Sequence, residues 1–181
     1  INDGDTEARG VEVEMTYIPT DNFRLDFNLG YLDHEYSDFT PTEETSVQWA
    51  NVDLSSMTVP FSPELNVGIA ATYSHDLSSG GSLTFNGSIH YQDEMETQPY
   101  PADAQAAGVL RTKKYTQVEE RTLVGAFVRW DSADDSLNIT AYGKNLTDER
   151  WRQSANAVAG LWNFTRYAPP REMGIRIGYS F

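Results

Sequence analysis

The sequence predicts an all-β protein, an antiparallel up-and-down meander of about seven strands that forms part of a transmembrane β-barrel. Three observations support this prediction. Apolar and polar residues alternate with a period of two in seven segments, the connections between them alternate between short and long, and no charged residue occupies any apolar face. The expected strands cover about residues 9–18, 23–36, 64–75, 82–93, 117–130, 137–152 and 170–181.

The first two segments are expected to form a hairpin. In the first, the odd positions from Val11 to Tyr17 are apolar, and the residues between them are polar. Residues 19–22 (PTDN) have the composition of a tight turn. Beyond this turn the odd positions from Phe23 to Tyr31 are apolar again, so both strands have one apolar and one polar face.

The other five segments alternate in the same way. Turn-forming residues at 76–81 separate the third segment from the fourth, and residues 131–136 separate the fifth from the sixth. The apolar positions of these segments are Leu65, Val67, Ile69, Ala71 and Tyr73; Leu83, Phe85, Gly87, Ile89 and Tyr91; Val124, Ala126, Val128 and Trp130; Leu137, Ile139 and Ala141; and Met173, Ile175, Ile177, Tyr179 and Phe181.

The long connections are expected at residues 37–63, 94–116 and 153–169. Because they alternate with the short turns, a meander places every long connection at one end of the sheet and every short turn at the other. Outer-membrane barrels have this asymmetry, with tight periplasmic turns and long extracellular loops. The long-loop end is therefore predicted to face the outside of the cell.

Charge and composition exclude several function classes. The 181 residues include 27 acidic and 13 basic side chains, a formal net charge of −14, which would repel the phosphates of a nucleic acid. The sequence contains no cysteine, so disulfides, thiolate nucleophiles and cysteine-ligated metals are excluded. No complete catalytic or metal-binding motif occurs. We therefore expect no enzyme activity, no catalytic residue, no metal site and no cofactor.

The hydropathy of the chain excludes a helical membrane protein, since the mean is −0.52 and no run approaches 18 apolar residues. Transmembrane strands escape this test because their alternating residues average out. A soluble β-sandwich would also have one face without charges, so only the opposite face can distinguish a sandwich from a membrane barrel. That face mixes Asn, Thr, Ser, Gly and His with scattered charges, Phe127 and Tyr142. Such a mixture suits a hydrated or plugged lumen.

Seven strands do not make a complete barrel. A bacterial single-chain barrel has an even number of strands and both termini in the periplasm. With the long loops outside, the last strand ends in the periplasm, so the first strand must start outside. Open edges would leave backbone groups without hydrogen bonds in lipid, at a cost of several kcal/mol for each group. We therefore expect the chain to be part of something longer, with the missing strands supplied elsewhere.

Two stretches near the end of the chain resemble a known family. Residues 141–151 (AYGKNLTDERW) are similar to its G-x-N-L-T-D-x-x-Y/W segment, and residues 169–181 (PPREMGIRIGYSF) are similar to its P-P-R-x-x-G close with alternating apolar residues and a terminal Phe. Residues 9–14 (RGVEVE) and 29–33 (LGYLD) resemble two further strands. The family is the TonB-dependent outer-membrane receptors, and the resemblance covers essentially the whole chain.

The resemblance implies a 22-stranded barrel with an N-terminal plug, of which these are the last seven strands. The plug and the TonB-contacting segment have no counterpart in this sequence, so we do not expect it to transport alone. The resemblance also implies that Ile177, Tyr179 and Phe181 form the signal that the barrel-assembly machinery recognises. Alternatively, Tyr179 and Phe181 only contact lipid and the periplasmic aromatic girdle.

Candidate ligand-binding residues are aromatic and basic side chains of the long loops, which can bind a sugar, an aromatic group or an anionic chelate by stacking and charge. Loop-on-loop packing and lipopolysaccharide contact are the alternatives. The candidates are Trp49, Arg111, Lys113, Lys114, Trp162 and Arg166.

The expected function is that of part of a receptor in the outer membrane of a Gram-negative bacterium, which imports a scarce nutrient: an iron chelate, cobalamin, a metal or an oligosaccharide. Expected partners are the rest of the barrel and its plug, the TonB complex through the missing N-terminal part, lipid and lipopolysaccharide, and the barrel-assembly machinery. One alternative is a small structural or adhesive barrel, closed by oligomerisation or by an eighth strand within 37–63. The other is a soluble β-sandwich binding module.

Overall fold

The computed structural model describes residues 4–42, 51–98, 116–158 and 162–181. These parts contain strands and no helix long and apolar enough to cross a membrane. The strands are β1 (Gly4–Thr20), β2 (Phe23–Phe39), β3 (Leu65–Asp76), β4 (Ser82–Gln92), β5 (Met95–Glu96), β6 (Gln117–Val118), β7 (Arg121–Asp131), β8 (Leu137–Lys144), β9 (Arg152–Val158), β10 (Trp162–Tyr167) and β11 (Glu172–Tyr179).

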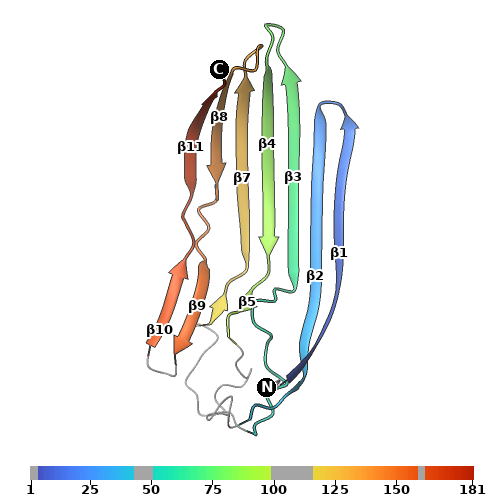
Figure 1. Cartoon of the computed structure of the whole chain (residues 1–181), viewed down its shortest axis with the longest axis vertical. Helices are drawn as coiled ribbons and strands as arrows, with labels where there is room; N and C mark the ends of the chain where they lie inside the picture. The colour runs from blue at the N-terminus through green and yellow to red at the C-terminus, as the bar shows by residue number, and fades with distance from the viewer. Residues whose placement is uncertain (1–3, 43–50, 99–115, 159–161) are drawn as a thin grey trace.

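Seven of these strands form one sheet in the order β1-β2-β3-β4-β7-β8-β11, with every neighbouring pair antiparallel. We call these seven the wall strands. The expected seven-stranded meander is confirmed, and the sheet is not closed, because β1 and β11 each have one partner within the described parts. Figure 1 shows the three short turns and the C-terminus at one end, and the long connections at the other.

The pairing register aligns the apolar residues of neighbouring strands. Met15 pairs with Phe27, Phe27 with Ile69, Ile69 with Ile89, and Ile89 with Val124. Because a slip of one residue would exchange the two faces, this register puts all the apolar positions on one side, here called the outer face. Ile69 and Ile89 are 43% and 50% exposed there. A continuous apolar surface of this kind is what lipid contact requires.

The other side of the sheet, the inner face, is polar and closely packed around its glycines. A Cβ on Gly68 would lie 2.4 Å from the side chain of Asn28, and a Cβ on Gly174 would lie 2.8 Å from the hydroxyl of Tyr142. Asn28 and Tyr142 thus each lie across a glycine of the neighbouring strand. No second sheet covers either face within the described parts, since the other two sheets are two-stranded. This arrangement is a barrel wall and not a β-sandwich.

Several expected boundaries were wrong. The strand expected over 137–152 ends at Lys144, because Asn145 adopts a left-handed conformation with φ of 49° and the chain turns. The strand expected over 117–130 is interrupted after Val118. The loop expected over 94–116 contains β5, and its partner β6 takes up the first two residues of the strand expected over 117–130. The loop expected over 153–169 contains nearly all of the β9–β10 pair. The two-residue strands β5 and β6 are too short to give an alternation in the sequence.

Buried apolar side chains lie in the long connections and not in the sheet. Within the described residues they are Leu54, Met57, Val59, Val118 and Ala155. A single-layered sheet has no interior of its own, so its apolar side chains stay exposed until lipid covers them. The packed core of this chain therefore lies at the long-loop end.

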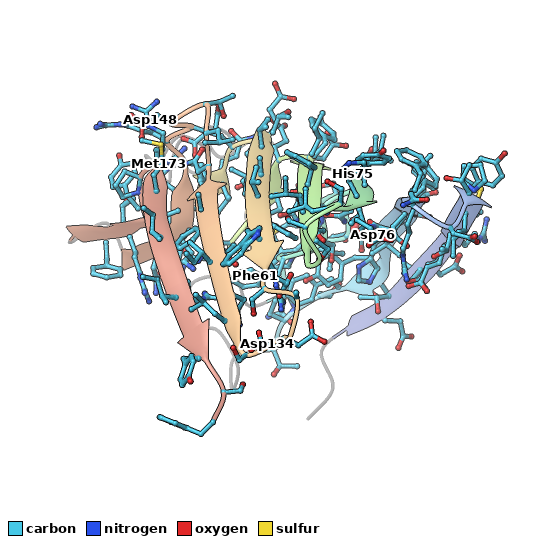
Figure 2. The ribbon with its side chains drawn as sticks, turned by 90° about the horizontal axis from the view of Figure 1, so that it is seen from above. Phe61, His75, Asp76, Asp134, Asp148 and Met173 are labelled. Atoms are coloured by element: carbon cyan, nitrogen blue, oxygen red, sulfur yellow. The ribbon has the colours of Figure 1, made fainter. Side chains whose placement is uncertain are left out.

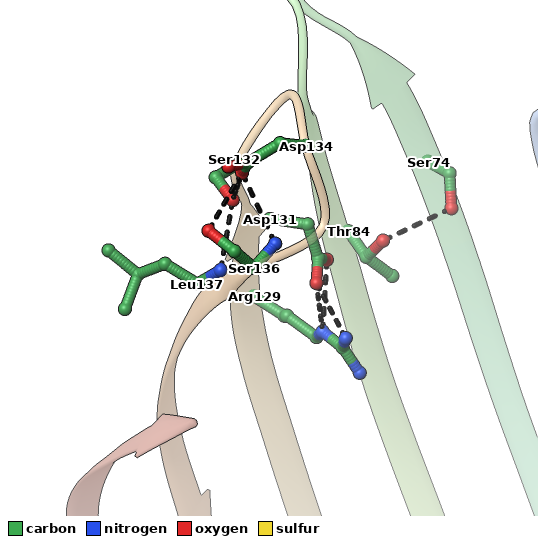
Figure 3. Close-up of polar contacts among 8 residues, drawn as sticks. All are labelled: Ser74, Thr84, Arg129, Asp131, Ser132, Asp134, Ser136 and Leu137. Atoms are coloured by element: carbon green, nitrogen blue, oxygen red, sulfur yellow. Dashed lines mark hydrogen bonds and ion pairs between the residues drawn. The ribbon is translucent and has the colours of Figure 1, made fainter. Parts of the chain in front are cut away.

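The short turn between β7 and β8 is held by one carboxylate. Asp134 Oδ1 accepts hydrogen bonds from Ser132 Oγ (2.7 Å), Ser136 Oγ (2.9 Å) and Ser136 N (3.2 Å), as Figure 3 shows. These hydrogen bonds to Ser132 and Ser136 lower the pKa of Asp134 from its ordinary value of 3.8 to about 2. The turn therefore favours the ionised carboxylate.

The first prediction concerns the two faces of β4. We expect Ile89→Arg to lower the free energy of unfolding by about 2–4 kcal/mol, because a lipid-facing guanidinium must be desolvated. The matched control His90→Arg lies on the inner face and should change it by less than about 1 kcal/mol. Urea unfolding of the protein in phospholipid vesicles, followed by tryptophan fluorescence, measures both. Equal effects would contradict lipid contact at the outer face.

The second prediction concerns pH. Because the pKa of Asp134 in the folded chain lies below its unfolded value, its contribution to stability is present above about pH 4 and is lost as the pH falls towards 2. An NMR titration of the side-chain carboxyl carbons should show Asp134 still ionised at about pH 3. Ser132→Ala should move this titration upwards. A titration near the ordinary value in the unsubstituted protein would show that the turn hydrogen bonds do not form.

Candidate functional site

Hydrogen bonds join the three long connections into one layer. Phe61 N donates to Glu96 O at 2.8 Å, which links the first connection to β5. Thr97 Oγ1 donates to Ala155 O at 2.6 Å, and Gln98 Nε2 donates to Asn156 Oδ1 at 2.5 Å, which link the second connection to β9. We call residues 51–64, the β5–β6 pair and β9 the long-loop layer. It is a single packed unit at the long-loop end of the wall strands.

The first connection returns onto the inner face of β2. His34 shares that face with Asp26 and Asn28, and His34 Nδ1 lies 3.0 Å from Ser62 Oγ. Leu54 N donates to Phe39 O at 2.7 Å, which fixes the other end of the segment. In the described part of 37–63, the chain beyond β2 adds one isolated bridge, between Thr58 and Glu35, and no eighth strand. The segment therefore partly covers the lumen.

A buried polar cluster holds the second connection. Thr97 and Thr116 are buried, and Thr97 N donates to Thr116 O at 2.8 Å. Thr116 Oγ1 donates to Glu96 Oε2 at 3.0 Å. Buried polar groups are stable only when hydrogen-bonded, so these contacts fix where the second connection leaves the sheet and re-enters it.

A charged pair joins the second and third connections. Arg152 Nε donates to Glu119 Oε1 at 2.8 Å, and the Arg152 side chain is only 12% exposed. Partial burial tends to raise the pKa of Glu119, but hydrogen bonds from Arg152 outweigh it and the pKa is lowered. The pair is therefore ionised at neutral pH and holds β9 against the start of β7.

The turn after β8 is built around Asn145. Its Oδ1 accepts from Glu149 N at 2.8 Å, its Nδ2 donates to Glu149 O at 2.9 Å, and the residue is buried. Asp148 Oδ1 accepts from Arg171 N at 3.0 Å, which joins the turn to the chain entering β11 and lowers the pKa of Asp148. The turn thus determines where β8 ends, where β9 begins and where the chain enters β11.

The inner face of the last strands carries a cationic and aromatic cluster. Lys144 Nζ and the Arg176 guanidinium lie 5.6 and 5.7 Å from the centroid of the Tyr142 ring, within the range of cation–π attraction. Tyr142 OH donates to Glu172 Oε1 at 3.1 Å, and Lys144 pairs with the same carboxylate at 3.5 Å. The cluster borders a hollow of about 360 Å³. It can contact a polar or anionic surface inside the lumen.

The long-loop layer borders an acidic cavity, and we call this region the mouth. The cavity has a volume of about 350 Å³ and is lined by Thr58, Ser62, Glu64, Asp93, Glu94, Met95, Glu96, Gln117 and Glu120. Among the residues whose positions are described, no group of three or more His, Cys, Asp or Glu side chains is placed to hold a metal ion. The cavity therefore favours neutral or cationic groups over anions by charge alone.

Phe61, in the first connection, has an uncommon backbone conformation. Its φ is 58°, and its side chain is 62% exposed. A bulky residue in the left-handed region costs about 1–3 kcal/mol, and the surrounding structure must hold it there. Figure 2 shows Phe61 on the concave side of the sheet.

A family model described as the β-barrel of TonB-dependent receptor-like proteins matches residues 1–146. The chain belongs to the TonB-dependent receptor β-barrel family. The resemblance noted in the sequence is thus confirmed, and the wall strands are those of a receptor barrel. The motif at 141–151 acquires a structural meaning as well, because it contains the end of β8 and the Asn145 turn.

Solved structures of other receptors have the same fold. The ferric yersiniabactin uptake receptor of Yersinia pestis matches 99% of this chain at a TM-score of 0.73 and 19% identity. The ferric preacinetobactin receptor of Acinetobacter baumannii matches 100% at 0.69 and 22% identity, and a chain of the FpvAI–pyocin S2 complex matches 97% at 0.63 and 13%. This chain spans 24%, 23% and 19% of the lengths of those three.

Four of the six predicted ligand-binding residues, Trp49, Arg111, Lys113 and Lys114, lie outside the described residues. Trp162 begins β10, where it pairs with Val158, and Arg166 is exposed on the same strand. Ligand binding by all six stays a prediction.

The three residues expected to form the barrel-assembly signal lie at the end of the receptor barrel wall. Ile177 and Tyr179 are exposed on the outer face of β11, and Phe181 follows that strand. The Tyr179 and Phe181 rings meet edge to face, with centroids 5.1 Å apart. Their exposure suits lipid contact and recognition equally, so recognition by the assembly machinery stays a prediction.

The sequence reasoning missed Phe61, Asn145 and the Tyr142 cluster as parts of the receptor surface. The prolines at 60 and 63 mark a constrained segment around Phe61, but nothing in the sequence reveals a positive φ at a phenylalanine. Lys144 and Arg176 belong to strands 32 residues apart in the sequence, so only the β8–β11 pairing brings them to one ring.

The third prediction concerns the Asn145 turn of this receptor barrel. Asn145→Ala should lower the free energy of unfolding by about 1–3 kcal/mol, because it removes two hydrogen bonds and puts alanine at a positive φ. The exposed neighbour Thr147→Ala is the control and should change it by less than about 0.5 kcal/mol. Urea unfolding in vesicles compares the two. If they behave alike, the turn does not stabilise the end of the wall.

Proposed function

We propose that this chain is the C-terminal part of the wall of a TonB-dependent outer-membrane receptor that binds a scarce nutrient and imports it. The family membership and the seven-stranded wall, with its apolar residues aligned on the outer face, support this proposal. The long-loop layer is the main support for the proposal. Its hydrogen bonds form a structured mouth at one end of a polar inner face.

The candidate nutrients are an iron chelate, cobalamin, a metal and an oligosaccharide. Of these we propose a ferric chelate. Two of the similar proteins are a ferric yersiniabactin uptake receptor and a ferric preacinetobactin receptor. Cobalamin, other metals and oligosaccharides are the competing cargoes of the test below.

In the proposed mechanism this segment supplies wall, lumen surface and mouth, and no covalent bond is made or broken. The ligand binds at the long-loop layer outside the cell. The plug then moves when the TonB complex acts on its N-terminal part with energy from the inner membrane, and the ligand passes along the polar inner face. The Tyr142, Lys144 and Arg176 cluster provides a charged contact on that path.

The proposed partners follow from the surfaces of the wall. The edges of β1 and β11 are open in the described sheet, and we propose that the remaining strands of the barrel pair with them. The plug occupies the concave side. Outer-membrane lipid and lipopolysaccharide contact the outer face, and the barrel-assembly machinery binds the strand that contains Ile177 and Tyr179. The location is the outer membrane of a Gram-negative bacterium.

The fourth prediction tests this function on the full-length receptor. Purified in detergent, it should bind a radiolabelled ferric chelate from a siderophore panel more tightly than cobalamin or maltodextrins. Cells that express it should accumulate the same chelate only when TonB is present, because passage requires energy from the inner membrane. Uptake that persists without TonB, or preference for a non-iron ligand, would contradict the corresponding part of the proposal.

The segment itself offers a simpler check. A chain with this outer face should require detergent or lipid to remain dispersed, because a row of exposed apolar residues in water drives association. A folded, monomeric form in buffer without detergent would exclude a lipid-facing wall and, with it, the receptor function.

A further inference from the structure

Phe61 differs from the other residues in the described parts that have a positive φ. Apart from glycines, these are Asn51, Asp135, Asn145 and Asp148, with φ between 49° and 61°, and Phe61 at 58°. Asn and Asp enter the left-handed region readily because their short polar side chains bond to nearby backbone. A phenylalanine has no such compensation. The local fold must therefore impose this conformation on Phe61.

The neighbours of Phe61 impose it. Phe61 N donates to Glu96 O at 2.8 Å, which ties the residue to β5. Pro60 and Pro63 have fixed φ values and limit movement on both sides. Ser62 Oγ donates to Pro60 O at 3.3 Å and contacts His34 on the inner face of β2. The backbone of residue 61 is thus held in place from two strands.

The ring of Phe61 does not contribute to the packed core. Met57 and Val59, four and two residues earlier, are buried at 6% and 9% exposure, whereas Phe61 is 62% exposed. The segment therefore buries its other apolar side chains and directs the aromatic one outwards. Figure 2 shows this residue on the concave side, where the lumen would lie. Phe61 is thus an exposed aromatic ring at the mouth, on a backbone fixed by a hydrogen bond to β5.

We propose that Phe61 is a binding residue for a planar aromatic or heteroaromatic group of the imported ligand. The inference rests on the proposed receptor function and specifies the chemistry of its ligand. Aromatic rings attract one another in offset-stacked or edge-to-face arrangements, and a ring held in place in advance loses little freedom on binding. The carboxylates that line the adjoining cavity give neutral or positively charged rings an advantage over anionic ones.

The experiment uses two neutral iron complexes that differ in aromaticity. Tris(3-hydroxy-1,2-dimethylpyridin-4-one)iron(III) presents aromatic rings, and tris(acetohydroxamato)iron(III) presents none, yet both surround iron with six oxygens. Isothermal titration of each complex into the full-length receptor in detergent gives the dissociation constants. We compare the unsubstituted receptor with Phe61→Ala, Phe61→Gly and Phe61→Trp. Phe164→Ala, at another exposed loop aromatic, is the matched control.

The unsubstituted receptor should bind the pyridinone complex more tightly. Phe61→Ala and Phe61→Gly should weaken that binding by about two- to tenfold, because stacking is lost, and leave the hydroxamate complex unchanged. Phe61→Trp should keep the preference, and Phe164→Ala should have no effect. Glycine relieves the strained backbone, so Phe61→Gly should fold at least as stably as Phe61→Ala.

Three results would overturn the inference: no preference for the pyridinone complex in the unsubstituted receptor, an equal loss for both complexes, or no loss in Phe61→Ala and Phe61→Gly. An equal loss together with lower stability would show that another part of the receptor covers the ring. TonB-dependent uptake of a ferric chelate is measured separately. If uptake occurs while Phe61 has no effect on either complex, the receptor function stands and the stacking role fails.

Discussion

Backbone hydrogen bonding within a single-layered sheet is the constraint on which the rest of this structure depends. Every wall strand pairs with its neighbours in an antiparallel register that aligns the apolar residues on the outer face and mostly polar residues on the inner face. The charged residues of the outer face in β1 and β2, such as Glu7 and Glu35, lie towards the long-loop end. In lipid an unpaired peptide group has no water to bond to, so the strands must satisfy each other. By the same requirement, the open edges of β1 and β11 are where further strands must pair.

In the described parts no second sheet packs on the wall, so the buried side chains lie in the long connections. The buried apolar residues, the Thr97–Thr116 cluster and the Arg152–Glu119 pair all lie in the long-loop layer. Under the proposed function this layer contacts the ligand, and hydrogen bonds join each connection to the next. One of these hydrogen bonds holds a strained aromatic residue, Phe61, at the mouth.

Much of the wall could be predicted from the sequence, and little of the mouth. The faces of all seven wall strands follow from local alternation, because side chains of a strand point to opposite sides whatever surrounds it. The end of β8 was expected eight residues too late, because the turn depends on hydrogen bonds between Asn145 and Glu149 that the alternation pattern does not reveal. The short β5–β6 pair depends likewise on its contact with β9, 58 residues from Thr97 in the chain.

The sequence by itself determined that this is a stretch of barrel wall of the TonB-dependent receptor family, with one lipid-compatible face and its long loops at one end. The wall follows from a period of two and from apolar positions free of charge, which are local properties of the chain, and the family follows from the resemblance of residues 141–151 and 169–181. Only the tertiary structure decided which loops bond to one another, that Lys144 and Arg176 share the ring of Tyr142, and that Phe61 is exposed on the concave side. These features depend on contacts between distant segments, which local pattern does not encode.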